Sequence, residues 1–125
     1  TRLTAEAVRV LLGFTLAHMG INEEKAEDAS KSVDLFSRLF RFPVAEGQSS
    51  YFLGQKEFEI MKSPGRGKKG HIALGVNDVE RALFYLGRQG IGPVAGTEKV
   101  KDGKLTIAYL DREISGFAIH LVKKG

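Results

Sequence analysis

The clearest alternation of hydrophobic and polar positions runs from His71 to Val76, and it predicts a β-strand. Three apolar side chains fall on one face of this stretch, which leaves the imidazole of His71 on the other face. Asn77 and Glu80 follow at the spacing of a capping box, so a helix is expected to begin with Asn77 as its cap. That helix is expected to reach Gln89, because apolar residues recur at helical spacing: Val79, Ala82, Leu83 and Leu86.

The same order of elements is expected earlier in the chain. Alternation over residues 14–21 predicts a strand, and Asn22 with the two glutamates after it opens a helix that reaches about Leu39. A hairpin follows, whose first strand, bend and second strand are residues 50–53, Gly54-Gln55 and residues 56–62.

Ser63–Gly70 is predicted to be a linker, because its proline, glycines and charges break regular structure. After the linker come a strand, a helix and three extended segments, which are residues 93–100, 105–110 and 116–122. The chain is therefore an internal duplication of a βαβββ module, with copies at 14–62 and 71–123. The expected fold is α+β: one domain over 14–125, with a curved mixed sheet, a concave cleft and helices outside.

Composition restricts the class of protein without identifying it. The chain has 125 residues, of which 42% are hydrophobic and 27% charged, as is ordinary for one globular domain. No run of about 18 apolar residues occurs, so no membrane span is expected, and no secretory signal is recognisable. The absence of cysteine excludes disulfides and thiolate chemistry, and a cytoplasmic location is expected. The net charge of +4 is not gathered in one arm, which argues against nucleic acid as a partner.

The first thirteen residues are expected to form an element of their own. Thr4 is placed to cap a short helix over residues 4–12, and Gly13 is placed to end it. A free-standing domain seldom needs such a preface, and the chain begins without methionine. Residues 1–13 are therefore predicted to be the tail of a preceding domain or a packing strut.

The candidate chemistry of the chain centres on its three histidines. His18 and His71 lie in the first strands of the two modules, and His120 lies in the last strand of the second module. Glu59 holds the place of His120 in the first module. The sequence neighbours of these four residues are apolar and should face the helices, which turns the four polar side chains towards the opposite face. Three imidazoles and one carboxylate on a cleft suit a divalent transition metal such as Zn, Ni, Mn or Fe.

Each of these residues also has a simpler interpretation, since a lone histidine on an open sheet face usually only contacts water. The coincidence of all three histidines with equivalent strands favours the metal site. Other candidates are less specific: Glu57 is expected on the strand face of Glu59, and Tyr51 and Tyr109 are candidates to line the cleft and contact a substrate. A solvent-exposed charge and ordinary strand packing are their alternatives, and no general base is identifiable.

These motifs resemble the vicinal-oxygen-chelate superfamily, which has the glyoxalase and bleomycin-resistance fold. His18–Ile21 is similar to the first ligand strand of that family, and His71–Val79 is similar to its third ligand strand and the helix cap that follows. Glu59 stands at the place of the second ligand. In the closing segment, Asp111–Leu121, the family usually has a glutamate ligand where this chain has His120, which removes one negative charge. The resemblance implies that these two histidines, Glu59 and His120 hold a divalent metal.

The resemblance also implies a kind of reaction. Members of the superfamily typically let two substrate oxygens chelate the metal, which stabilises an enolate or a similar anion. The expected enzyme is a metal-dependent lyase or isomerase acting on a small oxo acid or sugar acid. Many members pair to complete their clefts, so a homodimer is expected.

A closer resemblance concerns three stretches: residues 13–22, 58–64 and 116–122. They are similar to the extra domain of some bacterial 4-hydroxy-2-oxoglutarate / 2-dehydro-3-deoxyphosphogluconate aldolases. This resemblance implies a covalently linked aldolase domain whose Schiff-base lysine lies outside this chain. The chain would then be an accessory or assembly domain without a metal. A drug-sequestering protein of the bleomycin-resistance type is a third possibility, against which the absence of tryptophan counts.

Overall fold

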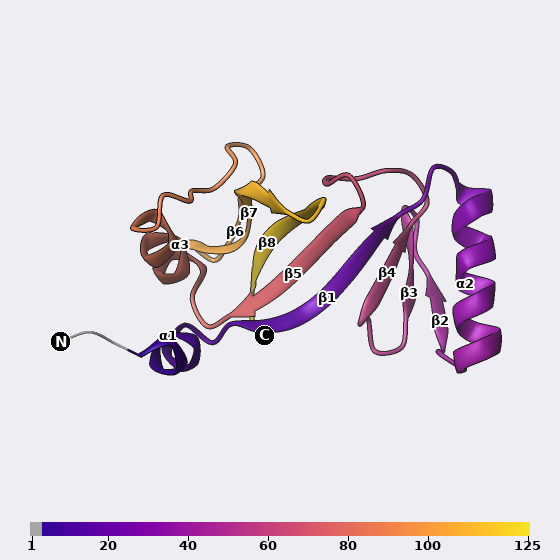
Figure 1. Ribbon diagram of the computed structural model, residues 1–125, viewed down its shortest axis with the longest axis horizontal. Coiled ribbons are helices and arrows are strands. Elements are labelled where there is room, and N and C mark those ends of the chain that lie inside the picture. Colours follow the sequence, from indigo (N-terminus) through magenta and orange to yellow (C-terminus); the bar gives the residue numbers. More distant parts are fainter. Residues whose placement is uncertain (1–3) are drawn as a thin grey trace. The chain divides into compact units, whose positions relative to one another are not determined.

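The computed structural model describes residues 4–125, and within them no helix is both long and apolar enough to cross a membrane. The order of helices and strands along the chain is that of two βαβββ modules preceded by a short helix (Figure 1). In chain order the elements are α1 (Ala5–Leu12), β1 (Thr15–Asn22), α2 (Ala26–Phe40), β2 (Val44–Glu46), β3 (Ser50–Leu53), β4 (Phe58–Met61), β5 (Gly70–Val76), α3 (Val79–Gly87), β6 (Lys99–Lys101), β7 (Lys104–Ile114) and β8 (Phe117–Lys123).

The chain divides into two compact units, which we name by their helices. The α2 unit comprises His18–Ile72 and Ser115–Ala118. The α3 unit comprises the stretch up to Ala17, Ala73–Ile114 and Ile119–Gly125. β1 and β5 each contribute residues to both units.

The strand order confirms the predicted fold of two βαβββ modules. The strands are hydrogen-bonded in the order β2-β3-β4-β1-β5-β8-β7-β6, so each module places its first strand beside its fourth, then its third and its second. β1 and β4 run parallel, whereas β3 is antiparallel to both β2 and β4. The sheet is therefore mixed, and the protein is an α+β fold.

In the α2 unit, one face of the strands packs against α2, which Figure 1 shows beside β2, β3 and β4. Leu53 of β3 and Ile60 of β4 are fully buried there against Ala29 and Val33 of the helix. Burying a side chain of this size contributes about 1.5–3 kcal/mol. Because side chains alternate between the two faces of a strand, Glu59 next to Ile60 is turned to the opposite face.

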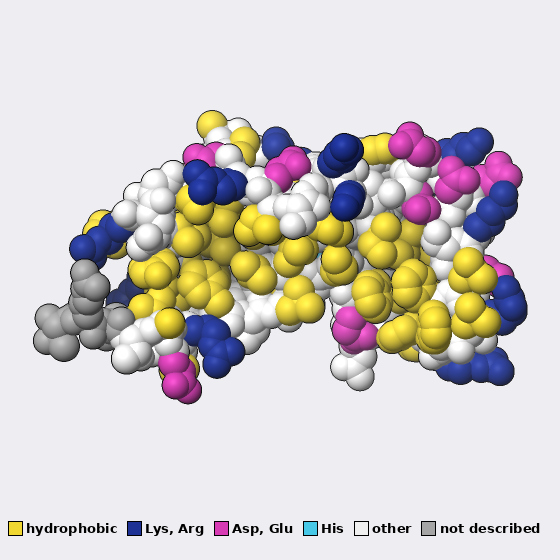
Figure 2. Space-filling view, in the orientation of Figure 1, with side chains coloured by type: hydrophobic (Ala, Val, Ile, Leu, Met, Phe, Trp, Pro, Cys, Tyr) yellow, Lys and Arg dark blue, Asp and Glu magenta, His cyan; other side chains and the backbone are white. Residues whose placement is uncertain are grey.

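Aromatic side chains extend this core to the surface. The ring of Phe36 stacks on that of Phe58 with centroids 5.3 Å apart, and Phe42 meets Phe58 edge-on at 5.8 Å. Such ring pairs contribute about 0.5–1.5 kcal/mol beyond the burial of their area. Phe40 at the end of α2 is 63% exposed, and Figure 2 shows hydrophobic side chains gathered on this part of the unit.

The α3 unit has a separate core in which α3 packs on its strands, and its fully enclosed members are Val76, Val79, Ala82, Ala108 and Leu121. The predicted cap of α3 is wrong by one residue. Asp78, and not Asn77, is the N-cap, and its carboxylate accepts from the backbone N–H of Arg81 at 3.0 Å. The side chain of Asn77 instead donates to the carbonyl of Leu11 at 3.2 Å. A contact with α1 thus removes Asn77 from the cap, which the local pattern does not reveal.

Two helix boundaries differ from the prediction. α2 begins at Ala26 and not at Asn22, because Asn22 is still the last residue of β1. α3 ends at Gly87, two residues before Gln89. The predicted short helix α1 is confirmed, with the Thr4 hydroxyl accepting from the backbone of its first turn at 3.0 Å.

Asn22 fastens the linker between the modules. Its side-chain N–H group donates to the carbonyl of Gly67 at 2.9 Å and to that of Gly65 at 3.4 Å. Its side-chain oxygen accepts from the backbone N–H of Gly65 at 3.1 Å. The linker is therefore a loop with defined hydrogen bonds and not an extended tether.

Candidate metal centre

Three of the four predicted ligands come together within the α2 unit. In the parallel ladder of β1 and β4, Gly20 lies opposite Glu59. His18 precedes Gly20 by two residues, so its imidazole lies on the face of Glu59. His71 is the second residue of β5, and its ring lies over Gly20 on that same face.

The ligand atoms of these three side chains point at one another. The Nε2 atoms of His18 and His71 are 3.2 Å apart. Oε1 of Glu59 lies 3.1 Å from Nε2 of His71 and 3.7 Å from Nε2 of His18. The three side chains are mostly withdrawn from water, with exposed fractions of 23% for His18, 16% for Glu59 and 6% for His71. Two imidazole nitrogens and one carboxylate oxygen therefore form a compact triangle.

This triangle has the dimensions of a transition-metal site. Ligand atoms at about 2.1 Å from a common ion, with angles of about 90–110° between them, lie about 3.0–3.4 Å from each other. The nitrogen–nitrogen distance and the shorter oxygen–nitrogen distance fall in this range. Two histidines and one carboxylate also match the donor preference of divalent first-row metals and leave further coordination positions open. The residues of the α2 unit thus fit the metal that the sequence predicts.

Gly20 is a member of the site that the sequence analysis missed. A Cβ atom built on Gly20 would overlap the ring of His71, so the imidazole occupies the space of the missing side chain. A glycine inside a strand commonly marks such a close approach. That general signal was present in the sequence, but nothing there indicates which side chain would use the space.

Ser50 is a second missed member. It is the first residue of β3 and only 3% exposed, and its hydroxyl donates to Oε2 of Glu59 at 2.7 Å. In the antiparallel ladder of β3 and β4, Phe52 lies opposite Glu59, so Ser50 faces the same side from two residues away. The two oxygens of Glu59 therefore have different partners: Oε2 meets the serine, and Oε1 meets the histidines.

The electrostatics of the triangle favour the metal-binding protonation states of two of its members, His18 and Glu59. Burial lowers the pKa of His18, the neighbouring His71 lowers it further, and Glu59 opposes both. The pKa of Glu59 is lowered chiefly by its hydrogen bond with His71 and also by that with Ser50, against the effect of burial. An uncharged imidazole and an ionised carboxylate are the forms that bind metal ions.

The fourth predicted ligand, His120, belongs to the α3 unit. It lies on β8 and is 6% exposed. Its ring stacks on that of Tyr109 from β7, with centroids 4.7 Å apart and planes 15° from parallel. The aromatic face of Tyr109 therefore holds the orientation of this imidazole within its own unit.

The other candidate residues have local partners in the α2 unit. Glu57 lies in the turn before β4, and its Oε1 accepts from the backbone N–H of Gln55 at 2.7 Å. Tyr51 packs against the core beside Ile60, on the face of β3 that is turned away from Glu59. The Nζ atom of Lys62 lies 4.8 Å from the centre of the Tyr51 ring.

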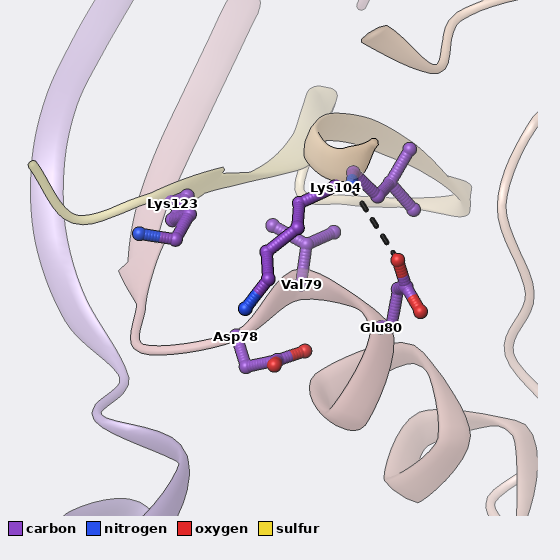
Figure 3. Close-up of a pocket in the computed structure, with 6 residues that line it drawn as sticks. Asp78, Val79, Glu80, Lys104 and Lys123 are labelled. Carbon is purple, nitrogen blue, oxygen red and sulfur yellow. Dashed lines mark hydrogen bonds between the residues drawn. The ribbon is translucent and has the colours of Figure 1, made fainter. Parts of the chain in front are cut away.

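The α3 unit has a polar pocket at the start of α3, which Figure 3 shows. Its lining residues are Asp78, Val79, Glu80, Lys104, Leu105 and Lys123. Lys104 points towards Asp78, and Oε1 of Glu80 accepts from the backbone N–H of Leu105 at 3.5 Å. The two carboxylates and two ammonium groups of this lining balance each other in charge, so the pocket is neither predominantly acidic nor predominantly basic.

Comparison with solved structures places the fold among known proteins. Methylmalonyl-CoA epimerase from Mycobacterium tuberculosis matches with a TM-score of 0.62 and 17% identity, over 92% of this chain and 90% of that chain. A structure described as methylmalonyl-CoA epimerase in complex with methylmalonyl-CoA and NH4+ matches at 0.60 and 15%, over 90% and 95%. The hypothetical protein BH1468 from Bacillus halodurans C-125 matches at 0.59 and 21%, over 90% and 95%.

At these identities the likeness establishes the fold and not the activity. The chain has a glyoxalase-like α+β fold, which it shares with solved structures described as methylmalonyl-CoA epimerases. No protein-family model matches the chain, and no curated protein sequence matches it either.

Proposed function

We propose that this protein is a metal-dependent enzyme that binds a small carbonyl compound and stabilises an anion formed from it. The observation that carries the proposal is the triangle of His18 Nε2, His71 Nε2 and Glu59 Oε1, whose edges are 3.1–3.7 Å long. A divalent ion held there would supply Lewis-acid stabilisation of negative charge on a substrate oxygen. Zn, Ni, Mn and Fe all suit this donor set.

The chain's own residues would hold the ion and set its geometry. His18 would give Nε2 of an imidazole whose lowered pKa favours the uncharged form, His71 would give its Nε2, and Glu59 would give Oε1 of a carboxylate whose lowered pKa favours the ionised form. His120 stays the predicted fourth ligand, on the strength of its equivalent strand position. Glu57, Tyr51 and Tyr109 stay predictions as substrate-contacting residues.

The substrate we propose is a small oxo acid or sugar acid. Such molecules present two nearby oxygens, which suits the metal chelation that the sequence resemblance implies. Methylmalonyl-CoA, named for one solved neighbour, likewise carries a carboxylate beside a thioester carbonyl. An isomerase or lyase reaction through an enolate would serve either substrate class. A homodimer and an association with an aldolase domain belong to the same proposal and follow from the sequence resemblance.

Metal content tests the proposal first. Protein prepared without chelator or histidine tag is analysed for elements, then stripped and titrated with Zn²⁺ and Co²⁺. Glu59→Gln and His71→Ala are expected to weaken binding by at least about tenfold. Glu57→Gln is the matched control, because Glu57 is a nearby carboxylate whose Oε1 already bonds to its own turn.

Two results would contradict the proposal: wild-type protein that takes up no metal after loading, or equal metal affinity in Glu59→Gln and Glu57→Gln. The first result would favour the accessory-domain interpretation. If metal binds, the loaded protein is incubated with oxo acids, sugar acids and methylmalonyl-CoA in deuterated water. Exchange of the proton next to the carbonyl, lost in His71→Ala, is the expected signature of the enolate.

A further inference from the structure

Ser50 forms a hydrogen bond with only one of the two carboxylate oxygens of Glu59. Its hydroxyl donates to Oε2 at 2.7 Å, and the same carboxylate directs Oε1 to Nε2 of His71 at 3.1 Å. We propose that Ser50 is a positioning residue that reserves Oε2 and makes Glu59 a ligand through Oε1 alone. This inference rests on the proposed metal function and adds a residue that sets the geometry of the ion.

The fold leaves this serine little freedom to do anything else. It is 3% exposed and begins β3, where its Cα lies opposite Met61 in the ladder with β4. The diagonal neighbour on the same face is Glu59, which is within reach of a short hydroxyl side chain. The ladder with β4 fixes the position of Ser50, and β4 is itself held by β1 on its other side, where Glu59 pairs with Gly20.

The hydrogen bond has a direct consequence for coordination. A carboxylate without other partners can bind an ion through both of its oxygens. This bidentate mode uses two coordination positions of the ion and requires the carboxylate to rotate until both oxygens face it. A donor fixed on Oε2 opposes that rotation and leaves one more position available for substrate oxygens. Hydrogen bonds of this kind to ligating carboxylates commonly change metal affinity by about 10–100-fold when removed.

The hydroxyl can be separated from the shape of the side chain. Ser50→Ala removes the donor, and Ser50→Thr and Ser50→Val form a pair of nearly equal volume in which only threonine keeps the hydroxyl. Both of the larger residues suit a strand. Ser49→Ala is the matched control, because the adjacent serine is exposed in the turn.

The test measures Co²⁺ affinity by competition with a chromophoric chelator and records the visible absorption of the bound ion. We expect Ser50→Ala and Ser50→Val to bind Co²⁺ about 10–100-fold more weakly than wild type, with an altered absorption spectrum. Ser50→Thr and Ser49→Ala are expected to match wild type within about threefold. Circular dichroism of each variant establishes that the fold is retained. If Ser50→Ala does not fold, the comparison of Ser50→Thr with Ser50→Val carries the test.

The outcomes distinguish the two proposals. If wild type binds Co²⁺ and both hydroxyl-free variants bind it equally well with an unchanged spectrum, the role of Ser50 is refuted while the metal site stands. Equal losses in Ser50→Thr and Ser50→Val would also refute it, since the hydroxyl would then be irrelevant. If wild type itself binds no metal, the proposed function fails and the role of Ser50 fails with it.

Discussion

The imidazole of His71 fills the space in which Gly20 would carry a side chain. Gly20→Ala is therefore expected to displace the ring and weaken metal binding by at least about tenfold, with an overpacking cost of about 1–3 kcal/mol. Calorimetric titration with Zn²⁺ and urea unfolding measure the two effects.

Gly87→Ala provides the control for that substitution. Nothing lies within 4 Å of a Cβ at Gly87, which is in α3, so alanine there should stabilise the protein by about 0.5–1 kcal/mol and leave metal affinity unchanged. Wild-type affinity in the Gly20→Ala variant would show that the His71 ring has another place to go.

Removing the hydrogen bonds between the Asn22 side chain and the linker should make the linker more mobile. Asn22→Ala deletes three hydrogen bonds to Gly65 and Gly67, which is expected to lower the free energy of unfolding by about 1–3 kcal/mol. Amide hydrogen exchange should accelerate over residues 63–70, and trypsin should cut sooner at the basic residues there. Exchange in α3 should stay unchanged and serves as the internal reference. Unchanged exchange in residues 63–70 as well would contradict the proposal that Asn22 holds the linker.

The cap of α3 predicts an inequality between neighbouring residues. Asp78→Ala is expected to cost about 1 kcal/mol because the carboxylate accepts from the backbone N–H of Arg81. Asn77→Ala should lose only an exposed hydrogen bond to Leu11 and cost less. Urea unfolding of both variants decides the order, and a larger loss from Asn77→Ala would mean that Asn77 is the effective cap.

The pair of Glu46 and Lys62 predicts a pH effect. Nζ of Lys62 lies 2.7 Å from Oε2 of Glu46, and this hydrogen bond is the main reason that the pKa of Glu46 is lowered. A depressed pKa adds stability above the pKa of the unfolded chain and loses it as the pH falls through the folded value. Carbon-detected NMR titration should show the low pKa, and Lys62→Met should raise it towards the ordinary value.

For an exposed carboxylate such as Glu46 the effect on stability is small, so the titration curve and not the melting temperature is the informative measurement. Lys56→Met is a suitable control, since Lys56 contacts the ring of Phe52 instead. A Glu46 pKa that does not move in Lys62→Met would assign the shift to another group.

Much of the fold was predictable because the sequence states it twice. Alternation of apolar residues predicts the strands around His18 and His71, and the glycine-rich linker separates two copies of one order of elements. The sequence-based prediction was wrong where a residue had two possible hydrogen-bond partners. Asn77 fits a helix cap, but a distant contact with Leu11 engages its side chain and leaves the cap to Asp78.

The convergence of three of the candidate ligands was also predictable. The rule that side chains alternate along strands predicts that His18, Glu59 and His71 share a face, and their ligand atoms do converge. Ser50 and Gly20 were not predicted, because their contacts with Glu59 and His71 depend on strand register. Whether Ser50 lies diagonal to Glu59 depends on the length of the hairpin turn, which local pattern leaves open by a residue or two.

In the α2 unit, Oε1 of Glu59 lies near both imidazoles, so a metal held there would have a single charged ligand among these three residues. A divalent cation with two uncharged imidazoles and one carboxylate retains a net charge of about +1. In the proposed site, a substrate that contributes a single negative oxygen, such as the carboxylate of an oxo acid, would neutralise that excess charge. A neutral diol would leave it uncompensated, so we expect the proposed ligand set to favour acids.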